Sequence, residues 1–267
     1  MACVIFTDLD GTLLDHHTYS WEAARPALEE LARRGIPWIP VTSKTRAELE
    51  VLRAELGHTH PFIVENGAAA FIPHDYFPFS IPGTVRRDGY EVVEWGRPYA
   101  YLRQALRRAA QHSGCDVTGF GDMTDEEVAA ACDLPLESAR LARRREYDEP
   151  FLIREAGKAS RLVDELRREA VHWTRGGRFW HLCGPADKGE AVKELCRWFA
   201  HHLGPLRSIG LGDSLNDLSF LRVVDVPVLM ATAQAGELRK DVPGVRIARL
   251  PGPAGWNAEV LELIGAG

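Results

Sequence analysis

The sequence predicts an α/β fold in which a core with a parallel sheet is interrupted by an inserted α+β domain. Residues 4–7 form an apolar, β-branched run that is typical of a buried strand. A helical pattern over 20–34 and an apolar run over 36–41 follow, and strand, helix, strand is the order of a parallel unit. From residue 84 the pattern becomes a mixture of short strands and amphipathic helices. We therefore expect core segments at 1–83 and 184–267 around an insert at 84–183.

Composition limits the classes of protein that the chain can belong to. Its 267 residues, 45% of them hydrophobic, are enough for one large or two modest cores. A net charge of -6 gives no electrostatic reason to expect nucleic acid or a membrane surface as a partner. The five cysteines are widely spaced and form no Cys-x-x-Cys pair, which argues against a disulfide framework or a zinc site. No signal-like segment or membrane-length apolar run occurs, so we expect a cytoplasmic protein.

The first strand ends in two aspartates, Asp8 and Asp10, separated by one leucine. Alternate residues of a strand point the same way, so the two carboxylates can converge on one point. Two like charges at close range are costly unless a cation lies between them, and a hard ion with oxygen ligands, Mg²⁺ first, is the natural candidate. An ordinary strand end with solvated aspartates is the alternative.

The second strand ends in Thr42 and Ser43, and parallel pairing would place this end beside Asp8. Thr45 and Glu48 follow at the spacing of a capping box, which predicts the start of a helix. A helix start offers backbone N–H groups to an anion, and a hydroxyl before it adds another donor. Simple helix capping would explain the same residues equally well.

An Asn-Gly pair at residues 66–67 separates two apolar runs and predicts a β-hairpin over 62–72. Prolines and a glycine over 78–83 then break the pattern and mark a domain boundary. In the insert we expect strands over 90–95, 151–154, 171–174 and 179–183, and helices over 99–111, 125–132, 136–144 and 160–169.

The second core segment opens with Lys188, the first residue of a helix expected over 188–203. A lysine at a helix start is usually a surface charge, although the helix dipole disfavours it there. A strand over 208–212 then ends in Gly-Asp-x-x-Asn-Asp, whose acidic residues are Asp213 and Asp217. Leu215 replaces the third glycine of a dinucleotide-binding fingerprint, so that interpretation is poor. Strands over 226–230 and 245–248 and a helix over 255–264 complete the segment.

Four segments, in this order, resemble the four motifs of the haloacid dehalogenase (HAD) superfamily of phosphatases and phosphotransferases. They are Asp8-Leu-Asp-Gly-Thr-Leu-Leu14, Thr42, Asp187-Lys-Gly189 and Gly212-Asp-Ser-Leu-Asn-Asp217. The resemblance implies that Asp8 is the nucleophile and Asp10 the general acid and base, and that Thr42 and Lys188 hold the phosphate. It also implies Mg²⁺ as cofactor, with Asp8, Asp10, Asp213 and Asp217 as the metal-site residues. Asp217 would act through a water or Lys188. Glu-Asn-Gly at 65–67 resembles the Cof-type branch, whose insert is a C2B-type cap over a Rossmannoid core.

Longer strings resemble the family of mannosyl-3-phosphoglycerate phosphatases. They lie at 41–48, 61–67, 145–151 and 176–182, in both the core and the insert. This resemblance implies a small phosphorylated glycoside as substrate, hydrolysed to mannosylglycerate and phosphate through a phosphoaspartyl intermediate. Arginine suits the carboxylate of such a substrate, because it pairs with carboxylates through two hydrogen bonds. The candidate substrate-binding residues are Ser43, Lys44, Glu65, Asn66, Gly67, Arg145, Gly177 and Arg178; His181 is a further candidate for a sugar hydroxyl, or a satisfied strand histidine.

Three other functions stay open at this point. A broader sugar-phosphate phosphatase, including one that accepts glucosyl-3-phosphoglycerate, would share every catalytic motif. A phosphomannomutase with the same cap type would return the phosphoryl group to a sugar. A non-catalytic binding protein is disfavoured because all the acidic motif positions are present. The sequence leaves the oligomeric state open.

Overall fold

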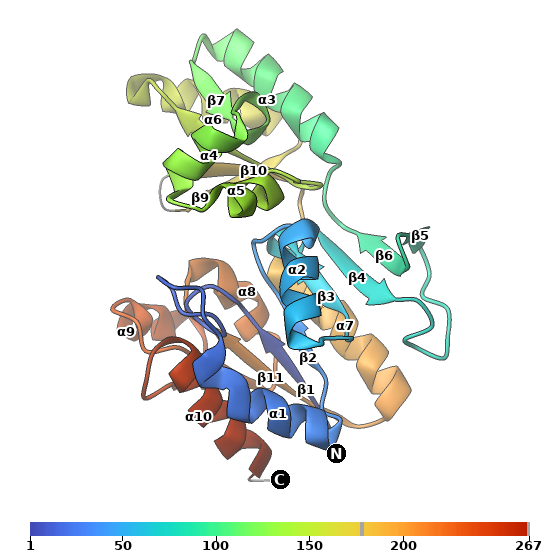
Figure 1. The fold of residues 1–267 in the computed structure, drawn as a ribbon. Coiled ribbons are helices and arrows are strands. Elements are labelled where there is room, and N and C mark those ends of the chain that lie inside the picture. Colours follow the sequence, from blue (N-terminus) through green and yellow to red (C-terminus); the bar gives the residue numbers. More distant parts are fainter. Residues whose placement is uncertain (177–178, 266–267) are drawn as a thin grey trace. The chain divides into compact units, whose positions relative to one another are not determined.

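A five-stranded parallel sheet forms the core of the computed structural model, which describes residues 1–176 and 179–265 (Figure 1). Its strand order is β13-β12-β11-β1-β2, and every pairing is parallel. The strands are β1 (Ala2–Thr7), β2 (Trp38–Pro40), β11 (Leu206–Gly212), β12 (Val226–Leu229) and β13 (Arg246–Ile247). The predicted α/β fold with a parallel sheet is therefore confirmed.

Helices cover both faces of this sheet. The order runs from β1 to β2 in one direction and from β11 to β12 in the other, so right-handed crossovers put their helices on opposite faces. α1 packs against α10, and α7 packs against α8 (Figure 1). These helices are α1 (Arg25–Arg34), α7 (Lys188–Leu203), α8 (Leu218–Leu221) and α10 (Gly252–Gly265); the short α9 is Ala235–Leu238. The two strands that are followed by motif aspartates, β1 and β11, are neighbours in the interior of the sheet.

A second, antiparallel sheet extends the core through the predicted hairpin. Its order is β3-β4-β6-β5, and Val41, directly after β2, forms a parallel bridge to Ile63 of β3. The strands are β3 (Phe62–Val64), β4 (Ala69–Pro73), β5 (Val85–Arg87) and β6 (Tyr90–Glu94). The hairpin prediction is confirmed, but its connection is a 3₁₀ turn over Glu65–Gly67 rather than a two-residue turn.

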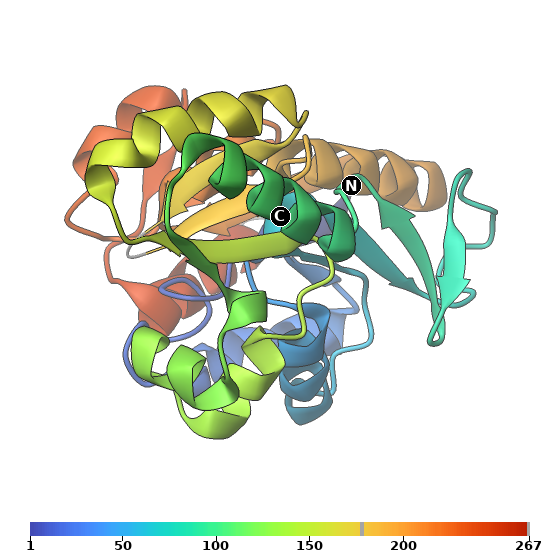
Figure 2. The ribbon, with the colours of Figure 1, turned by 90° about the horizontal axis from the view of Figure 1, so that it is seen from above.

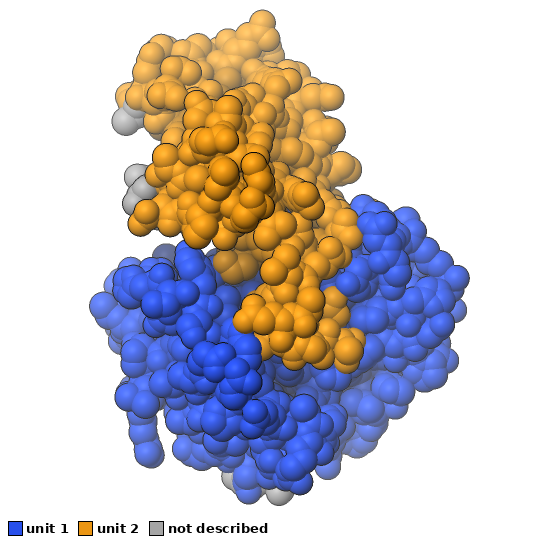
Figure 3. Space-filling view, in the orientation of Figure 1, with its two compact units in different colours: residues 1–42, 60–93, 187–267 blue, residues 43–59, 94–186 orange. Residues whose placement is uncertain are grey.

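The chain divides into two compact units that differ from the predicted domains (Figure 3). Unit 1 contains residues 1–42, 60–93 and 187–267, and unit 2 contains residues 43–59 and 94–186. The predicted insert began at residue 84, but β6 pairs with β4 and so groups with unit 1. The helix after the second strand, α2 (Arg46–Leu56), groups with unit 2 because it packs on α5.

Unit 2 is built on an antiparallel sheet of order β7-β8-β10-β9. α3 and α6 lie side by side over it (Figure 2), and their core includes Leu102, Leu162 and Phe151. α4 and α5 pack together around a smaller cluster with Val128 and Phe120. The elements are α3 (Tyr99–Ser113), α4 (Asp125–Cys132), α5 (Leu136–Ala142), α6 (Ala159–Arg168), β7 (Val117–Gly119), β8 (Asp148–Ile153), β9 (His172–Gly176) and β10 (Phe179–Cys183). The sequence did not predict β7.

Helix boundaries follow the predicted capping signals. Thr45 and Glu48 form the predicted capping box at the start of α2. Gly35 ends α1 in the left-handed conformation, with a φ of 63°. Within the described residues, six 3₁₀ turns connect elements, at Glu22–Ala24, Glu65–Gly67, Phe120–Asp122, Ala156–Lys158, Leu215–Asp217 and Arg239–Asp241. In the described ranges we find no helix that combines the length and the apolar character needed to cross a membrane.

Candidate active site

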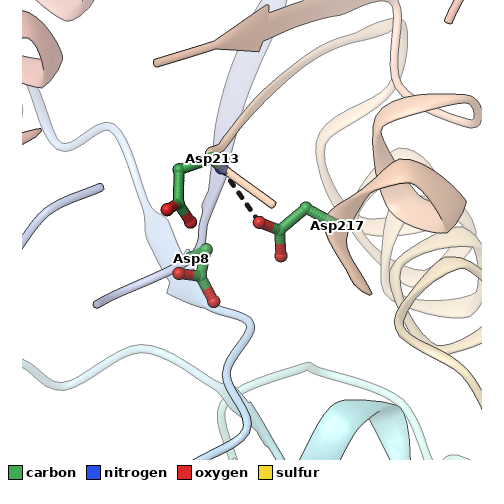
Figure 4. A group of neighbouring side chains, drawn as sticks. All are labelled: Asp8, Asp213 and Asp217. Atoms are coloured by element: carbon green, nitrogen blue, oxygen red, sulfur yellow. Dashed lines mark hydrogen bonds between the residues drawn. The ribbon is translucent and has the colours of Figure 1, made fainter. Parts of the chain in front are cut away.

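Three aspartates converge at the carboxyl ends of β1 and β11 (Figure 4). Asp8 directly follows β1, and its backbone N–H donates to the carbonyl of Leu211 over 2.9 Å, which aligns the two strand ends. Asp213 follows β11, and Asp217 lies one turn further along the same loop. One carboxylate oxygen from each lies within 4.8 Å of the others. Parallel pairing of two adjacent strands therefore assembles a cluster from positions about two hundred residues apart.

Lys188 joins this cluster from the first turn of α7. Its Nζ lies 2.6 Å from Asp8 Oδ1 and 2.6 Å from Asp217 Oδ1, and the side chain is buried. Burial lowers the pKa of Lys188, but Asp217 and Asp8 outweigh that effect and raise the pKa above its ordinary value. Lys188 therefore stays charged. Its unfavourable place at a helix start is explained by the two carboxylates that it contacts.

Asp217 uses both carboxylate oxygens within the protein. Oδ1 accepts from Lys188, and Oδ2 accepts from the backbone N–H groups of Asp213 and Ser214 over 2.9 and 3.0 Å. The side chain is fully buried. Asp217 therefore fixes the turn that presents Asp213, and it orients the ammonium group of Lys188.

The cluster carries more negative than positive charge. Burial first, and then the charge of Asp217, raise the pKa of Asp8 well above its usual range. The same two causes, together with Asp10, raise the pKa of Asp213 to about 7. When all three carboxylates are ionised, they exceed the single ammonium group by two negative charges. Buried oxygen donors with that excess fit a divalent, oxygen-preferring cation such as Mg²⁺.

The loop after β1 packs directly against Asp213. Gly11 has a φ of 81°, and a Cβ built there would lie 2.6 Å from Asp213 Oδ2. A side chain at this position would be strained and would also displace Asp213. The neighbouring Asp10 bridges to Leu14 and is close enough for its charge to act on Asp213. The loop thus brings Asp10 to the edge of the cluster.

The turn over Glu65–Gly67 ties Thr42 to the other catalytic segments. Its three residues all have positive φ, at 46°, 60° and 94°. Asn66 N–H donates to the carbonyl of Thr42 over 2.9 Å, and its Oδ1 accepts from Asn216 over 3.1 Å. Gly67 lies against the residue before Lys188, where a Cβ would come within 2.2 Å of the Asp187 carbonyl. Such strained turns persist where surrounding contacts hold them, and here those contacts come from three motif segments.

Three of the candidate substrate residues, Ser43, Lys44 and Arg145, lie within unit 2. Arg145 donates from Nη1 to the carbonyl of Ser43 over 2.8 Å and from Nε to that of Ala142 over 2.9 Å. Lys44 Nζ lies 3.9 Å from a carboxylate oxygen of Glu48. Arg145 thus holds the segment that carries Ser43 and Lys44.

Asp148 contacts both Arg145 and His181 in the same unit. Its Oδ2 is 3.5 Å from Arg145 Nη1 and 2.7 Å from His181 Nδ1, and the carboxylate is buried. The candidates Gly177 and Arg178 lie outside the described residues.

Comparison with known proteins agrees with this fold. Residues 5–77 match the family model described as haloacid dehalogenase-like hydrolase. A structure from Thermoplasma acidophilum superimposes with a TM-score of 0.68 at 15% identity, over the whole of both chains. A HAD subclass IIB sugar phosphatase superimposes with a TM-score of 0.66 at 17% identity, over 99% of both chains. The predicted HAD fold with an inserted cap is thus confirmed.

Full-length sequence similarity decides the family. The chain is 44% identical to the glucosyl-3-phosphoglycerate/mannosyl-3-phosphoglycerate phosphatase of Methanococcoides burtonii, over 99% of this chain and 98% of that protein. The chain belongs to this family of HAD phosphatases. The relative of the same name from Persephonella marina is 41% identical over 98% and 97% of the two chains. The mannosyl-3-phosphoglycerate phosphatase of Pyrococcus furiosus is 39% identical over 90% and 94%. As a member of this family, the protein is a phosphoric monoester hydrolase.

The structure also adds two residues that sequence reasoning did not find. Thr7 and Trp256 are both fully buried, and they form a hydrogen-bonded chain that ends at the backbone of Asp8. Their separation in sequence is 249 positions, so no local pattern could have paired them.

Proposed function

We propose that the protein hydrolyses the phosphate ester of mannosyl-3-phosphoglycerate, releasing mannosylglycerate and phosphate through a phosphorylated Asp8. The observation that carries this proposal is the buried cluster in which Asp8 meets Lys188 and Asp213 at two adjacent strand ends. The family's full-length similarity supports the substrate class. The chemistry divides into two displacements at phosphorus, each with a carboxylate in a definite role.

In the first displacement a carboxylate oxygen of Asp8 attacks phosphorus, and the bond from phosphorus to the glycerate oxygen breaks. Asp10 gives its proton to that leaving oxygen, so the oxygen departs as a hydroxyl group and not as an alkoxide. In the second displacement a water attacks the phosphorylated Asp8 and transfers a proton to Asp10. The bond between phosphorus and Asp8 breaks, phosphate leaves, and both aspartates return to their initial states.

Charge on the phosphoryl group is balanced by residues on three segments. Lys188 neutralises Asp8 and the phosphate oxygens, and Thr42 donates a hydrogen bond from the end of the second strand. Asp8, Asp10 and Asp213 would hold Mg²⁺, with Asp217 behind them on Lys188 and the Asp213 backbone. The cation, when bound, supplies positive charge that draws the anionic phosphate towards the anionic nucleophile. The excess of negative charge in the cluster supports this role.

The glycerate and sugar would contact residues outside the catalytic cluster. Ser43, Lys44, Arg145, Gly177 and Arg178 remain our candidates, together with the turn over 65–67. Within that turn, Gly67 packs on the start of α7 and Asn66 bonds Asn216, which supports a positioning role besides substrate contact. We propose that Arg145, besides any contact with substrate, holds the Ser43 backbone in place.

Glucosyl-3-phosphoglycerate is a second candidate substrate. Two of the relatives carry both substrates in their names, and they are somewhat more similar to this chain than the relative named for the mannosyl compound alone. The two glycosides differ in the orientation of one hydroxyl. Acceptance of both would therefore require only a tolerant sugar site over the same catalytic centre.

Phosphate release with Mg²⁺ tests the proposal across mannosyl-3-phosphoglycerate, glucosyl-3-phosphoglycerate, 3-phosphoglycerate, mannose 6-phosphate and sucrose phosphate. We expect the two glycosyl phosphoglycerates to be hydrolysed fastest and Asp8→Asn to be inactive on all five. Equal rates on mannose 6-phosphate would replace the substrate with a general sugar phosphate. Interconversion of mannose phosphates in the presence of a hexose bisphosphate would instead identify a mutase.

A further inference from the structure

A buried chain of two hydrogen bonds links the end of β1 to the last helix, α10. Trp256 of α10 donates from Nε1 to Oγ1 of Thr7 over 2.9 Å. The Thr7 hydroxyl donates to the carbonyl oxygen of Asp8 over 2.7 Å. Both side chains are fully buried, and Trp256 is the largest side chain of the core with that property.

The direction of this chain follows from the chemistry of its members. An indole N–H can only donate, so the Thr7 oxygen must accept from Trp256. The hydroxyl has one proton, and the remaining partner within reach is the carbonyl of Asp8, an acceptor. Replacing the indole N–H would leave the Thr7 hydroxyl held only by its own hydrogen bond to Asp8, so its orientation would be less restrained.

Both backbone groups of Asp8 are therefore restrained. Its N–H donates to Leu211 of β11, and its carbonyl accepts from Thr7. The helix that supplies Trp256 is itself anchored, because the next residue, Asn257, accepts from the backbone N–H of Ala27 in α1 over 2.9 Å. The position of Asp8 is thus coupled to two helices on one face of the sheet.

We infer that Trp256 and Thr7 are positioning residues for the Asp8 nucleophile, acting through its backbone carbonyl and not through contact with substrate. A nucleophile must approach phosphorus in line, and displacements well below 1 Å reduce the rate of such reactions. This inference rests on the proposed role of Asp8. It predicts an effect on the chemical step, with substrate binding left largely intact.

The test measures kcat and KM on p-nitrophenyl phosphate, a generic phosphate monoester that does not depend on the identity of the natural substrate. Trp256→Phe keeps the aromatic ring and removes the N–H. We expect kcat to fall about 3- to 10-fold, the size of one ordinary hydrogen bond, with KM changed less than twofold. Thr7→Val, of nearly equal volume, should lower kcat further, and Thr7→Ser should restore most of it.

A double variant distinguishes two hydrogen bonds that act in series from two that affect kcat independently. If the hydrogen bonds act in series, Thr7→Val combined with Trp256→Phe should lower kcat no more than Thr7→Val alone. Val260→Ala, on the same helix and fully buried, is the matched control: it should lower thermal stability and leave kcat unchanged.

Three results would overturn the inference. The first is wild-type kcat in a folded Trp256→Phe protein, and the second is multiplicative effects in the double variant. The third is a fall in kcat for Val260→Ala equal to that for Trp256→Phe. Asp8→Asn, measured alongside, keeps the two proposals apart. Activity in Asp8→Asn would contradict the proposed function itself, whereas an inactive Asp8→Asn beside an unaffected Trp256→Phe would contradict only the positioning role.

Discussion

Unit 1 and unit 2 each contain a buried group of charged side chains among the candidate site residues, and these two groups differ in their balance of charge. The Asp8 cluster of unit 1 contains Asp8, Asp213 and Asp217 around one cation, Lys188. The Asp148 cluster of unit 2 surrounds a single buried carboxylate with Arg145 and His181. Burial raises the pKa of Asp8 and Asp213, which shows that their ionised forms are under-compensated.

This difference distinguishes a candidate cation-binding site from a cluster that stabilises the fold. A cluster whose charges balance within the protein stabilises the fold around it. A buried cluster with uncompensated negative charge lowers the stability of the fold unless a cation binds. The same excess of charge favours the binding of a cation. Arg145 resembles a ligand-binding arginine in sequence, yet in the structure it pairs with the Asp148 carboxylate and donates to two backbone carbonyls of its own unit.

Lys188→Met should lower kcat by roughly 10²- to 10³-fold, because it removes the cation that contacts both Asp8 and Asp217. Lys193→Met is the matched control on the same helix. Lys193 is about half exposed and pairs loosely with Glu190, so its loss should leave kcat unchanged. Steady-state kinetics on both variants checks the prediction. Equal kcat values for the two would mean that the charge of Lys188 has no catalytic role.

Asp148→Ala should lower the free energy of unfolding by about 2 to 4 kcal/mol, because it leaves the mostly buried Arg145 without its carboxylate. Asp164→Ala, which removes an exposed partner of Arg167, should cost at most about 1 kcal/mol. Urea denaturation of both proteins gives the comparison. If Asp148→Ala proved as stable as Asp164→Ala, the Asp148 cluster would not be a structural support.

Gly67→Ala should lower kcat roughly 10- to 100-fold, because the new Cβ would force the Asp187 backbone and the start of α7 to move. Gly35→Ala carries the same kind of backbone penalty, since its φ is 63°, but its Cβ would meet nothing within 4 Å. It should cost about 1 kcal/mol of stability and no activity. A similar loss of kcat in both variants would point to general destabilisation instead of a displaced Lys188.

Asp213→Asn should raise the stability of the metal-free protein at pH 8 by about 1 to 2 kcal/mol. The pKa of Asp213 is about 7 in the folded protein against 3.8 in the reference state, so the folded protein holds the proton more tightly. Its contribution to stability is thus lost as pH rises from about 4 through 7. Thermal unfolding in EDTA at pH 5 and pH 8 should show a clearly larger gain at the higher pH, because the penalty builds up from about pH 4 and is complete only above about pH 7. Mg²⁺ should stabilise wild type but not Asp213→Asn; stabilisation of both would exclude Asp213 as a ligand.

The clustering of the motif residues could be predicted from the sequence more readily than the contacts around them, for physical reasons. Asp8, Lys188 and Asp213 stand at strand ends and a helix start, positions that local patterns mark and that parallel pairing brings together. β7 was missed because it has only three residues and ends at a glycine. β6 was assigned to the insert because its pairing with β4 depends on the tertiary structure and cannot be predicted from local composition.

Contacts between residues far apart in the chain could not be predicted from local sequence patterns. Arg145 carries a chemistry suited to carboxylates in general, and only the fold decides that it contacts Asp148 and the Ser43 carbonyl. Trp256 and Thr7 bear no motif at all. Their role follows from one hydrogen bond across the whole length of the chain.

The most direct test of the account is to trap the phosphorylated enzyme. Substrate labelled with ³²P in its phosphate group is mixed with the protein and Mg²⁺, quenched in acid within milliseconds, and the digested peptides are separated. We expect label on the peptide that contains Asp8, and none in Asp8→Asn. Rapid phosphate release without any labelled peptide, or label on another residue, would contradict Asp8 as the nucleophile.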